Sequence, residues 1–142
     1  SVTISSGRFS RVSGGNRYLG GVIVGDVSVT MNGGIVDTYL SGSGVGNVNG
    51  NVSVTINGGK IGYGVYGMDC LSDRPTWLAG DLTLTINGGE LAGSIAAAKF
   101  DTNGTLDGIF TCYINGCILI FPFIWIIRNN CCIYCCYTNN IL

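Results

Sequence analysis

One short pattern of apolar and polar residues recurs along the chain and predicts its secondary structure. In VSVTMNGGIV (27–36), VSVTINGGKI (52–61) and LTLTINGGEL (82–91), apolar residues alternate with Ser or Thr over the first five positions. Strict alternation predicts a β-strand that buries one face. The Asn-Gly-Gly that follows predicts a turn, because Asn and Gly tolerate the left-handed backbone conformation. An apolar residue two places beyond the last Gly then predicts a second strand.

The pattern occurs five times, although the first copy is partial (VTISSGRF, 2–9) and the last is degraded (FTCYINGCIL, 110–119). Taking the apolar residue before each turn as the anchor gives spacings of 27, 25, 30 and 28 residues between Ile4, Met31, Ile56, Ile86 and Ile114. A period of this size is typical of a solenoid, since no single copy can bury its apolar face alone. We therefore predict an all-β fold, a parallel β-helix (β-solenoid) of about five rungs with a period of 25–30 residues.

The composition of two connecting segments predicts their structure. The segment AGSIAAAKF (92–100) is expected to form another strand, because the solenoid must continue through it. The segment SGSGVGNVNG (41–50) is small and polar. Such composition is typical of flexible loops, so we expect this segment on the outer edge.

Stacking of the copies places four asparagines above one another, with Ser5 at the same place in the first rung. The four are Asn32, Asn57, Asn87 and Asn115. Neighbouring strands lie about 4.8 Å apart, so side-chain amides in one column can hydrogen-bond from rung to rung. We predict an interior Asn ladder.

The alternation also assigns a face to each strand residue. The inward set includes Val54, Ile56, Leu84 and Ile86. The outward set forms two hydroxyl columns, Ser28, Ser53, Thr83 and Thr111 in one and Thr3, Thr30, Thr55 and Thr85 in the other. This array is similar to the surface that ice-binding β-helices present, but Thr is also simply a good strand former. Ice binding and lateral packing against another solenoid are both alternatives for this face.

The phrase V-x-V-T-I-N-G-G-x-I, with the later Gly-Val-Tyr-Gly at 64–67, resembles repeats of large right-handed parallel β-helix proteins on microbial cell surfaces. The resemblance covers residues 2 to about 119. It implies the wider pectate-lyase-like β-helix fold, in which an Asn ladder at the tight turn is common. Polysaccharide lyases, adhesins and fibre or sheath subunits share that fold, so the resemblance does not choose among their functions.

Composition excludes several classes of function. The net charge is −1 and the chain has no His. The first observation removes the basic footprint of a nucleic-acid-binding protein, and the second removes the commonest general base and metal ligand. We therefore predict no enzyme activity, no catalytic residues, no cofactor and no metal site. Charged residues make up only 11% of the chain, which argues against a freely soluble monomer.

Two groups of polar side chains are candidates for a cation site and for glycosylation. Asp26, Asn51 and Asp81 share a column just before the strand phrase. Because the middle member is Asn, we expect hydrogen bonding at turns there rather than a carboxylate cluster for a cation. Asn51-Val-Ser and Asn103-Gly-Thr match the pattern of N-glycosylation acceptors.

The last part of the chain differs in kind from the repeats. Residues 1–119 are expected to form the solenoid, and 120–142 an apolar, Cys-rich tail that packs as an end rung or against another molecule. The unbroken apolar run 117–127 is too short to span a membrane and contains Pro122, so we do not favour a membrane anchor. Cys131, Cys132, Cys135 and Cys136 have C-x-x-C spacing. Disulfides are favoured over zinc, since no His and no second pair at finger distance assist.

These features together predict a structural subunit of an extracellular filament, sheath or surface layer, a homopolymer built by end-to-end stacking. The chain starts at Ser1, almost inside a strand and without a signal peptide, which we interpret as a processed chain or a fragment. The first rung then has no cap, and a bare rung exposes strand edges that invite another chain. Residues 1–25 carry a charge of +3 and residues 69–107 carry −4, which suits head-to-tail contact.

The alternative is a carbohydrate-binding or carbohydrate-cleaving β-helix domain, a fragment of an adhesin or lyase, with glycans as partners. Such a domain needs acidic and basic side chains beside aromatics. The segment 69–78 breaks the repeat and supplies that mixture in Asp69, Arg74 and Trp77. Either function places the protein outside the cell or at its surface.

Overall fold

The alternating phrases form the strands that the sequence predicts, and these strands pair in parallel. In the computed structural model, β5 (Val27–Met31), β9 (Val52–Ile56) and β13 (Leu82–Ile86) align residue for residue, Val27 with Val52 and Val52 with Leu82. The structure describes residues 1–16, 21–69, 76–98, 104–116, 118–119, 124–125 and 131–135, the last three segments and Gly104 by their backbone alone. These residues form strands and turns and contain no helix.

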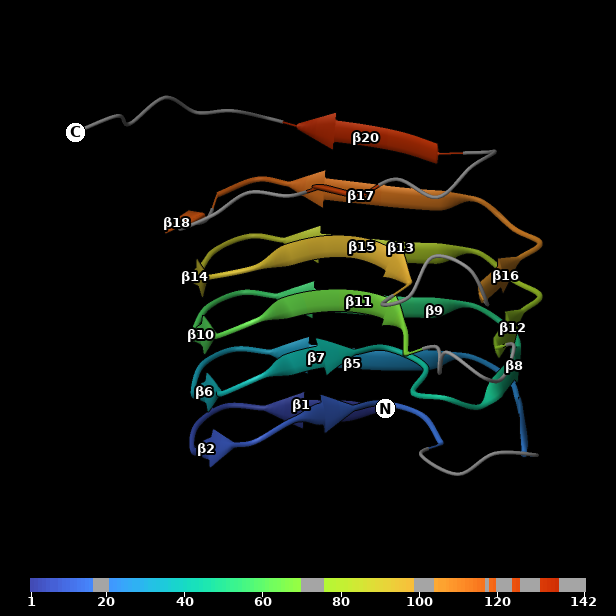
Figure 1. Cartoon of the computed structure of the whole chain (residues 1–142), viewed down its shortest axis with the longest axis horizontal. Coiled ribbons are helices and arrows are strands. Elements are labelled where there is room, and N and C mark those ends of the chain that lie inside the picture. The colour runs from blue at the N-terminus through green and yellow to red at the C-terminus, as the bar shows by residue number, and fades with distance from the viewer. Residues whose placement is uncertain are drawn as a thin grey trace.

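The five copies of the phrase occupy successive places in one sheet. Its order is β1-β5-β9-β13-β17-β20, with β1 at Val2–Ile4, β17 at Phe110–Ile114 and β20 at Cys131–Cys135. Figure 1 shows these strands stacked one above the other, from β1 at the bottom to β20 at the top. The sixth strand, β20, lies beyond the last predicted copy and continues the stack into the Cys-rich tail.

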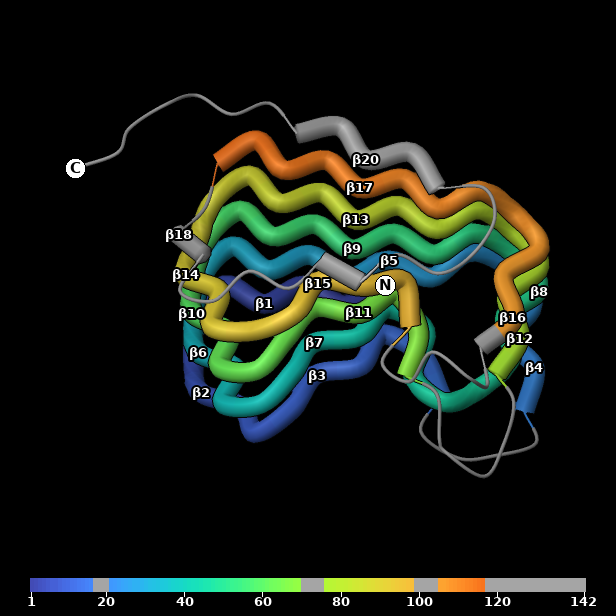
Figure 2. Tube along the Cα trace, turned by 45° about the horizontal axis from the view of Figure 1, so that its top comes forward, coloured from blue at the N-terminus to red at the C-terminus, as the bar shows by residue number. Residues whose placement is uncertain are grey.

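Three further parallel sheets complete the coil, and Figure 2 shows the chain winding from sheet to sheet with each turn above the last. The second sheet contains β2 (Arg8–Phe9), β6 (Ile35–Val36), β10 (Lys60–Ile61), β14 (Glu90–Leu91) and β18 (Ile118–Leu119). The third contains β3 (Val12–Ser13), β7 (Tyr39–Ser41), β11 (Gly64–Met68), β15 (Ser94–Ala98) and β19 (Ile124–Trp125). The fourth contains β4 (Val22–Val24), β8 (Asn47–Asn49), β12 (Thr76–Leu78) and β16 (Gly104–Leu106). The predicted fold, an all-β parallel β-solenoid, is therefore confirmed.

The predicted register of the core is also confirmed. The inward residues Val54, Ile56, Leu84 and Ile86 are fully buried. Thr55 and Thr85, between them in sequence, are only partly covered. The second Gly of each Asn-Gly-Gly turn has positive φ, at 91° for Gly34, 95° for Gly59 and 100° for Gly89. That conformation is the reason the turn needs glycine.

The strand expected within 92–100 is confirmed by β15. The connection 41–50 differs from its prediction. Residues 41–46 are buried and Asn47–Asn49 form β8, so the prediction of a loop on the outer edge is wrong for most of the segment, and only Asn49 is exposed. The small residues serve close packing instead. A Cβ atom at Gly42 would lie 2.4 Å from a Val52 methyl group and 2.7 Å from the Gly67 carbonyl oxygen. Only glycine fits there.

Candidate functional site

The outward side of the sheet β1-β5-β9-β13-β17 carries the two hydroxyl columns, and we call this surface the hydroxyl face. Strand pairing aligns Ser28, Ser53, Thr83 and Thr111 in one column and Thr3, Thr30, Thr55 and Thr85 in the other. Thr3 is exposed and the other seven are partly exposed. The second column ends at β17, where Tyr113 follows Thr85.

None of these eight hydroxyls has a hydrogen-bond partner among the residues that the structure describes. Neighbouring rungs lie about 4.8 Å apart. Hydroxyl oxygens at that separation are too far apart to bond to each other, since such bonds are about 2.7–2.8 Å long. The columns therefore present unsatisfied donors and acceptors to solvent.

The Asn ladder flanks the hydroxyl face on one side. Nδ2 of Asn57 donates to Oδ1 of Asn32 at 2.8 Å, Nδ2 of Asn87 donates to Asn57 at 2.8 Å, and Nδ2 of Asn115 donates to Asn87 at 2.7 Å. All four residues are exposed, so the prediction of an interior ladder is wrong. Strand parity gives the reason: Met31 points inward, and the next residue, Asn32, points outward like Thr30.

A second ladder flanks the hydroxyl face on the other side. Oδ1 of Asp26 accepts the Asn51 N–H at 2.7 Å, Oδ1 of Asn51 accepts the Asp81 N–H at 2.9 Å, and Oδ1 of Asp81 accepts the Ile109 N–H at 2.9 Å. Each side chain thus bonds to the backbone of the next rung. This arrangement holds rungs together, and no group of three acidic or thiol side chains suited to a metal occurs in the described part of the chain.

We expect the exposed Asn ladder to contribute modestly to stability. Asn57→Ala removes one bond to Asn32 and one to Asn87, while water replaces part of both. The free energy of unfolding should fall by about 1 kcal/mol, measured by urea denaturation. Asn49→Ala is the matched control, because Asn49 is also exposed and its side chain has no hydrogen bond within the described residues. Equal losses in the two variants would show that the ladder adds nothing.

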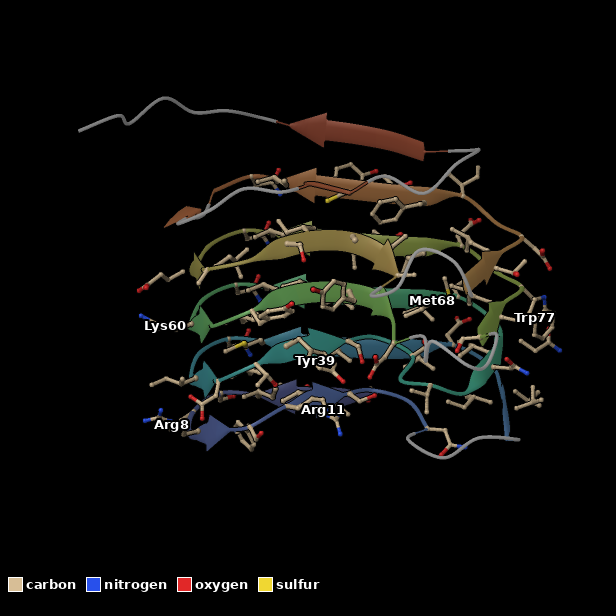
Figure 3. The ribbon with its side chains drawn as sticks, in the orientation of Figure 1. Arg8, Arg11, Tyr39, Lys60, Met68 and Trp77 are labelled. Atoms are coloured by element: carbon tan, nitrogen blue, oxygen red, sulfur yellow. The ribbon has the colours of Figure 1, made fainter. Side chains whose placement is uncertain are left out.

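A polar group on the third sheet was not predicted from the sequence. Nη1 of Arg11 donates to the Tyr39 hydroxyl at 2.6 Å, and that hydroxyl donates to Oδ2 of Asp69 at 2.6 Å. Figure 3 shows Arg11 beneath Tyr39. The central carbon of the Arg11 guanidinium lies 5.3 Å from the centroid of the Tyr39 ring. Tyr39 and Asp69 are buried. A buried carboxylate needs such hydrogen bonds, so the group ties three successive turns together.

The outer side of this group borders a shallow hollow of about 370 Å³, lined by Ser10, Arg11, Thr38 and Tyr39. Arg11 is exposed at its edge. A signal for the group exists in the sequence, since Arg11, Tyr39 and Asp69 are separated by 28 and 30 residues, the length of one repeat. Because the residue types differ from turn to turn, a search for repeated residues does not show that these three share a column.

Two ion pairs line the second sheet. Nε of Arg8 lies 3.0 and 3.1 Å from the two carboxylate oxygens of Asp37, and Nζ of Lys60 lies 2.6 Å from Oε1 of Glu90. The hydrogen bond that Arg8 donates to Asp37, and then the charge of that carboxylate, raise the pKa of Arg8. Figure 3 shows Arg8 and Lys60 on the same side of the solenoid. Exposed pairs of this kind stabilise little.

The remaining predicted site residues are placed only in part. Asn51, in the first glycosylation pattern, is exposed, whereas Asn103 lies outside the described residues. The backbone of Cys131, Cys132 and Cys135 belongs to β20. Their side chains, and all of Cys136, are outside the described part, so the predicted disulfides stay a prediction. Within the described ranges, no helix has the length and apolar character needed to cross a membrane.

No protein-family model, curated protein or solved structure matches this chain. Function is therefore inferred from the geometry of the solenoid and of its surfaces.

Proposed function

We propose that the chain is a structural subunit of an extracellular filament, sheath or surface layer, and that it self-assembles by end-to-end stacking of its solenoid. The observation that carries this proposal is the open end formed by β1, β2, β3 and β4. Each of these strands is the last in its sheet, and no other described strand pairs with its outer edge. Unpaired strand edges are templates for pairing with another chain.

The apolar core runs out to this end without a polar cover in the described residues. Phe9 continues the buried column of Val36, Ile61 and Leu91, yet it is 40% exposed because nothing described lies below it. Solenoids that remain single carry terminal capping structure with a polar outer face. A further rung from a second copy would bury Phe9 and satisfy the strand edges together.

Outward residues at the same end add apolar surface. Val22 is 54% exposed and Val24 is 85% exposed, both on β4. In the neighbouring strand β8, the corresponding positions are Asn47 and Asn49. Apolar side chains thus appear at the end of this sheet where the next turn carries amides, and such a patch favours contact with a partner surface.

Charge favours head-to-tail rather than head-to-head stacking. Arg11 lies on the first turn, whereas Asp81 and Asp107 lie on the turn that contains β13 and β14. Arg8 and Glu90 are already paired with Asp37 and Lys60. Opposite charges toward opposite ends attract in head-to-tail order, and this contribution weakens as salt screens it. The resemblance of the repeats to pectate-lyase-like β-helix proteins of microbial cell surfaces supports an extracellular location.

Thr3→Pro tests the stacking. The Ile4 carbonyl accepts the N–H of Asn32, the residue that follows β5. Alternate residues of a parallel strand bond to opposite neighbours, so the Thr3 N–H faces the open edge. Proline removes that donor and is tolerated on edge strands. We expect wild-type chains to form stacked assemblies in sedimentation velocity and electron microscopy. Thr3→Pro should sediment mainly as single chains whose far-UV circular dichroism shows the same β-structure as the wild type.

Thr3→Val is the matched control, because it keeps the backbone N–H and changes only the outward side chain. This variant should assemble like the wild type. A wild-type chain that sediments as a single species at micromolar concentration would contradict the proposal. So would assemblies that persist undiminished in Thr3→Pro.

A carbohydrate-binding or carbohydrate-cleaving domain is the second candidate, and one observation favours it. The hollow beside Tyr39 combines an exposed Arg11 with an aromatic ring and a nearby carboxylate, Asp69. Mixtures of this kind orient polar ligands in pockets. Incubation with pectin-like polysaccharides tests this candidate: cleavage or tight binding that Arg11→Ala abolishes would support it over a purely structural role.

A further inference from the structure

We infer that the hydroxyl face binds the surface of ice, a function beyond assembly. The face presents hydroxyls in two dimensions, about 4.8 Å apart along the stack and about 6.6 Å apart along each strand. The grid is complete for the strands β5, β9 and β13, in which both outward positions are Ser or Thr: Ser28 and Thr30, Ser53 and Thr55, Thr83 and Thr85.

Water is the partner open to these hydroxyls, because they are exposed or partly exposed. The two flanking ladders satisfy their own Asn and Asp side chains from rung to rung. The hydroxyls between them have no partner in the described part of the chain. Each offers one donor and two acceptor sites, so each must bond to water. Water molecules held this way repeat with the spacing of the sheet.

The face is rigid enough to impose that spacing. The strands pair residue for residue from Val27 to Met31, from Val52 to Ile56 and from Leu82 to Ile86, without a bulge. Thr side chains are restricted at χ1 because they branch at Cβ. The ladders on both sides further fix the distance between rungs. A regular, uncharged array of water-binding groups is suited to a crystalline water surface, in which oxygen atoms also repeat in two dimensions.

Other occupants fit this surface less well. Interfaces between proteins concentrate aromatic residues, Met and Arg at their cores. The aromatic residues in register with the hydroxyl columns, Tyr113 on β17 and Tyr134 on β20, come only after the complete grid, at its upper margin. A second copy would bury eight hydroxyls that have no partner within the described ranges, and it would gain little apolar contact. Neutral polysaccharides present apolar ring faces, for which the short Ser and Thr side chains offer no aromatic platform. Ice needs neither.

Thermal hysteresis, the gap between the melting and growth temperatures of a single ice crystal, tests this inference on the full chain. We expect the wild-type protein to produce hysteresis and to be incorporated into slowly growing ice. Thr55→Lys places a long charged side chain at the centre of the grid, so hysteresis should be lost. Ser53→Lys, in the other column, should have the same effect. Far-UV circular dichroism establishes that each variant keeps its β-structure.

Asn49→Lys is the matched control, because Asn49 is exposed on β8, a strand of a different sheet. It should keep full hysteresis. A wild-type chain without hysteresis would overturn the inference, and so would folded Thr55→Lys and Ser53→Lys chains that retain it, or binding to crystalline cellulose instead of ice. Sedimentation of the same samples separates this result from the proposed assembly, since stacked chains without hysteresis contradict only the ice-binding inference.

Discussion

Gly93→Ala is expected to destabilise the solenoid severely. A Cβ atom at Gly93 would lie 1.4 Å from the carbonyl oxygen of Tyr63 on the turn below. That oxygen also accepts the Ser94 N–H at 3.1 Å, so backbone movement to relieve the clash would break a bond between turns. We expect the free energy of unfolding to fall by about 4 kcal/mol or more, at the upper end of single substitutions. Thermal and urea unfolding followed by circular dichroism would measure this loss.

Gly116→Ala is the matched control for that experiment. The atom nearest to its added Cβ would be the Asn87 carbonyl oxygen at 3.3 Å, a contact that a small shift relieves. The control should therefore lose far less stability than Gly93→Ala. Similar losses in both would mean that the turns are not packed backbone against backbone at Gly93.

The strands and their register could be predicted because they depend on local pattern. Alternation in residues 52–56 and 82–86 specifies which side chains turn inward, and stacking copies of one phrase leaves a single register. The structure places Val54 and Leu84 in the core accordingly. The same parity rule, carried one residue past Ile56, would have placed Asn57 outside. The outward position of the Asn ladder therefore follows from the sequence through the same alternation.

Other features depend on contacts between turns that the sequence pattern does not reveal. Residues 41–46 read as a loop by composition, yet they are buried because Gly42 admits a methyl group of Val52 and the backbone of Gly67. The contacts of Arg11, Tyr39 and Asp69 join three different residue types, one from each of three turns. Repeat analysis finds columns of like residues and overlooks such mixed columns. That the hydroxyl columns have no partner among the described residues likewise emerges only from the three-dimensional arrangement.

The hydroxyl face and the open end would reinforce each other if both proposals hold. Head-to-tail stacking on β1 would add a second hydroxyl grid to the same rigid body, separated from the first by the rungs of β20 and β17, where Tyr134 and Tyr113 take the place of Thr in the second column. Binding to an extended surface then involves more sites on one rigid body, and linked sites bind more tightly than separate ones. Thr3→Pro should accordingly weaken ice binding without removing it, whereas Thr55→Lys should leave sedimentation unchanged.

Leu84→Ala is expected to produce the second large loss of stability. Leu84 is fully buried on β13, between Val54 on β9 and Cys112 on β17 in the register of the sheet. Shortening a buried Leu to Ala removes apolar contacts and leaves a cavity, at a cost of about 3 kcal/mol. Because each turn of a solenoid is stabilised mainly by its two neighbours, the cavity weakens both interfaces of β13. Urea denaturation would measure the loss as a lower midpoint.

Thr85→Ala is the control that makes this measurement a test of register. Thr85 is the next residue on the same strand and faces outward, partly exposed, in the second hydroxyl column. Its hydroxyl has no partner in the described residues, so its removal should cost less than about 1 kcal/mol. A one-residue shift of the strand would exchange the two environments, because successive side chains face opposite sides. Thr85→Ala would then cost more than Leu84→Ala, and the assignment of the hydroxyl face would fail together with the register of the core.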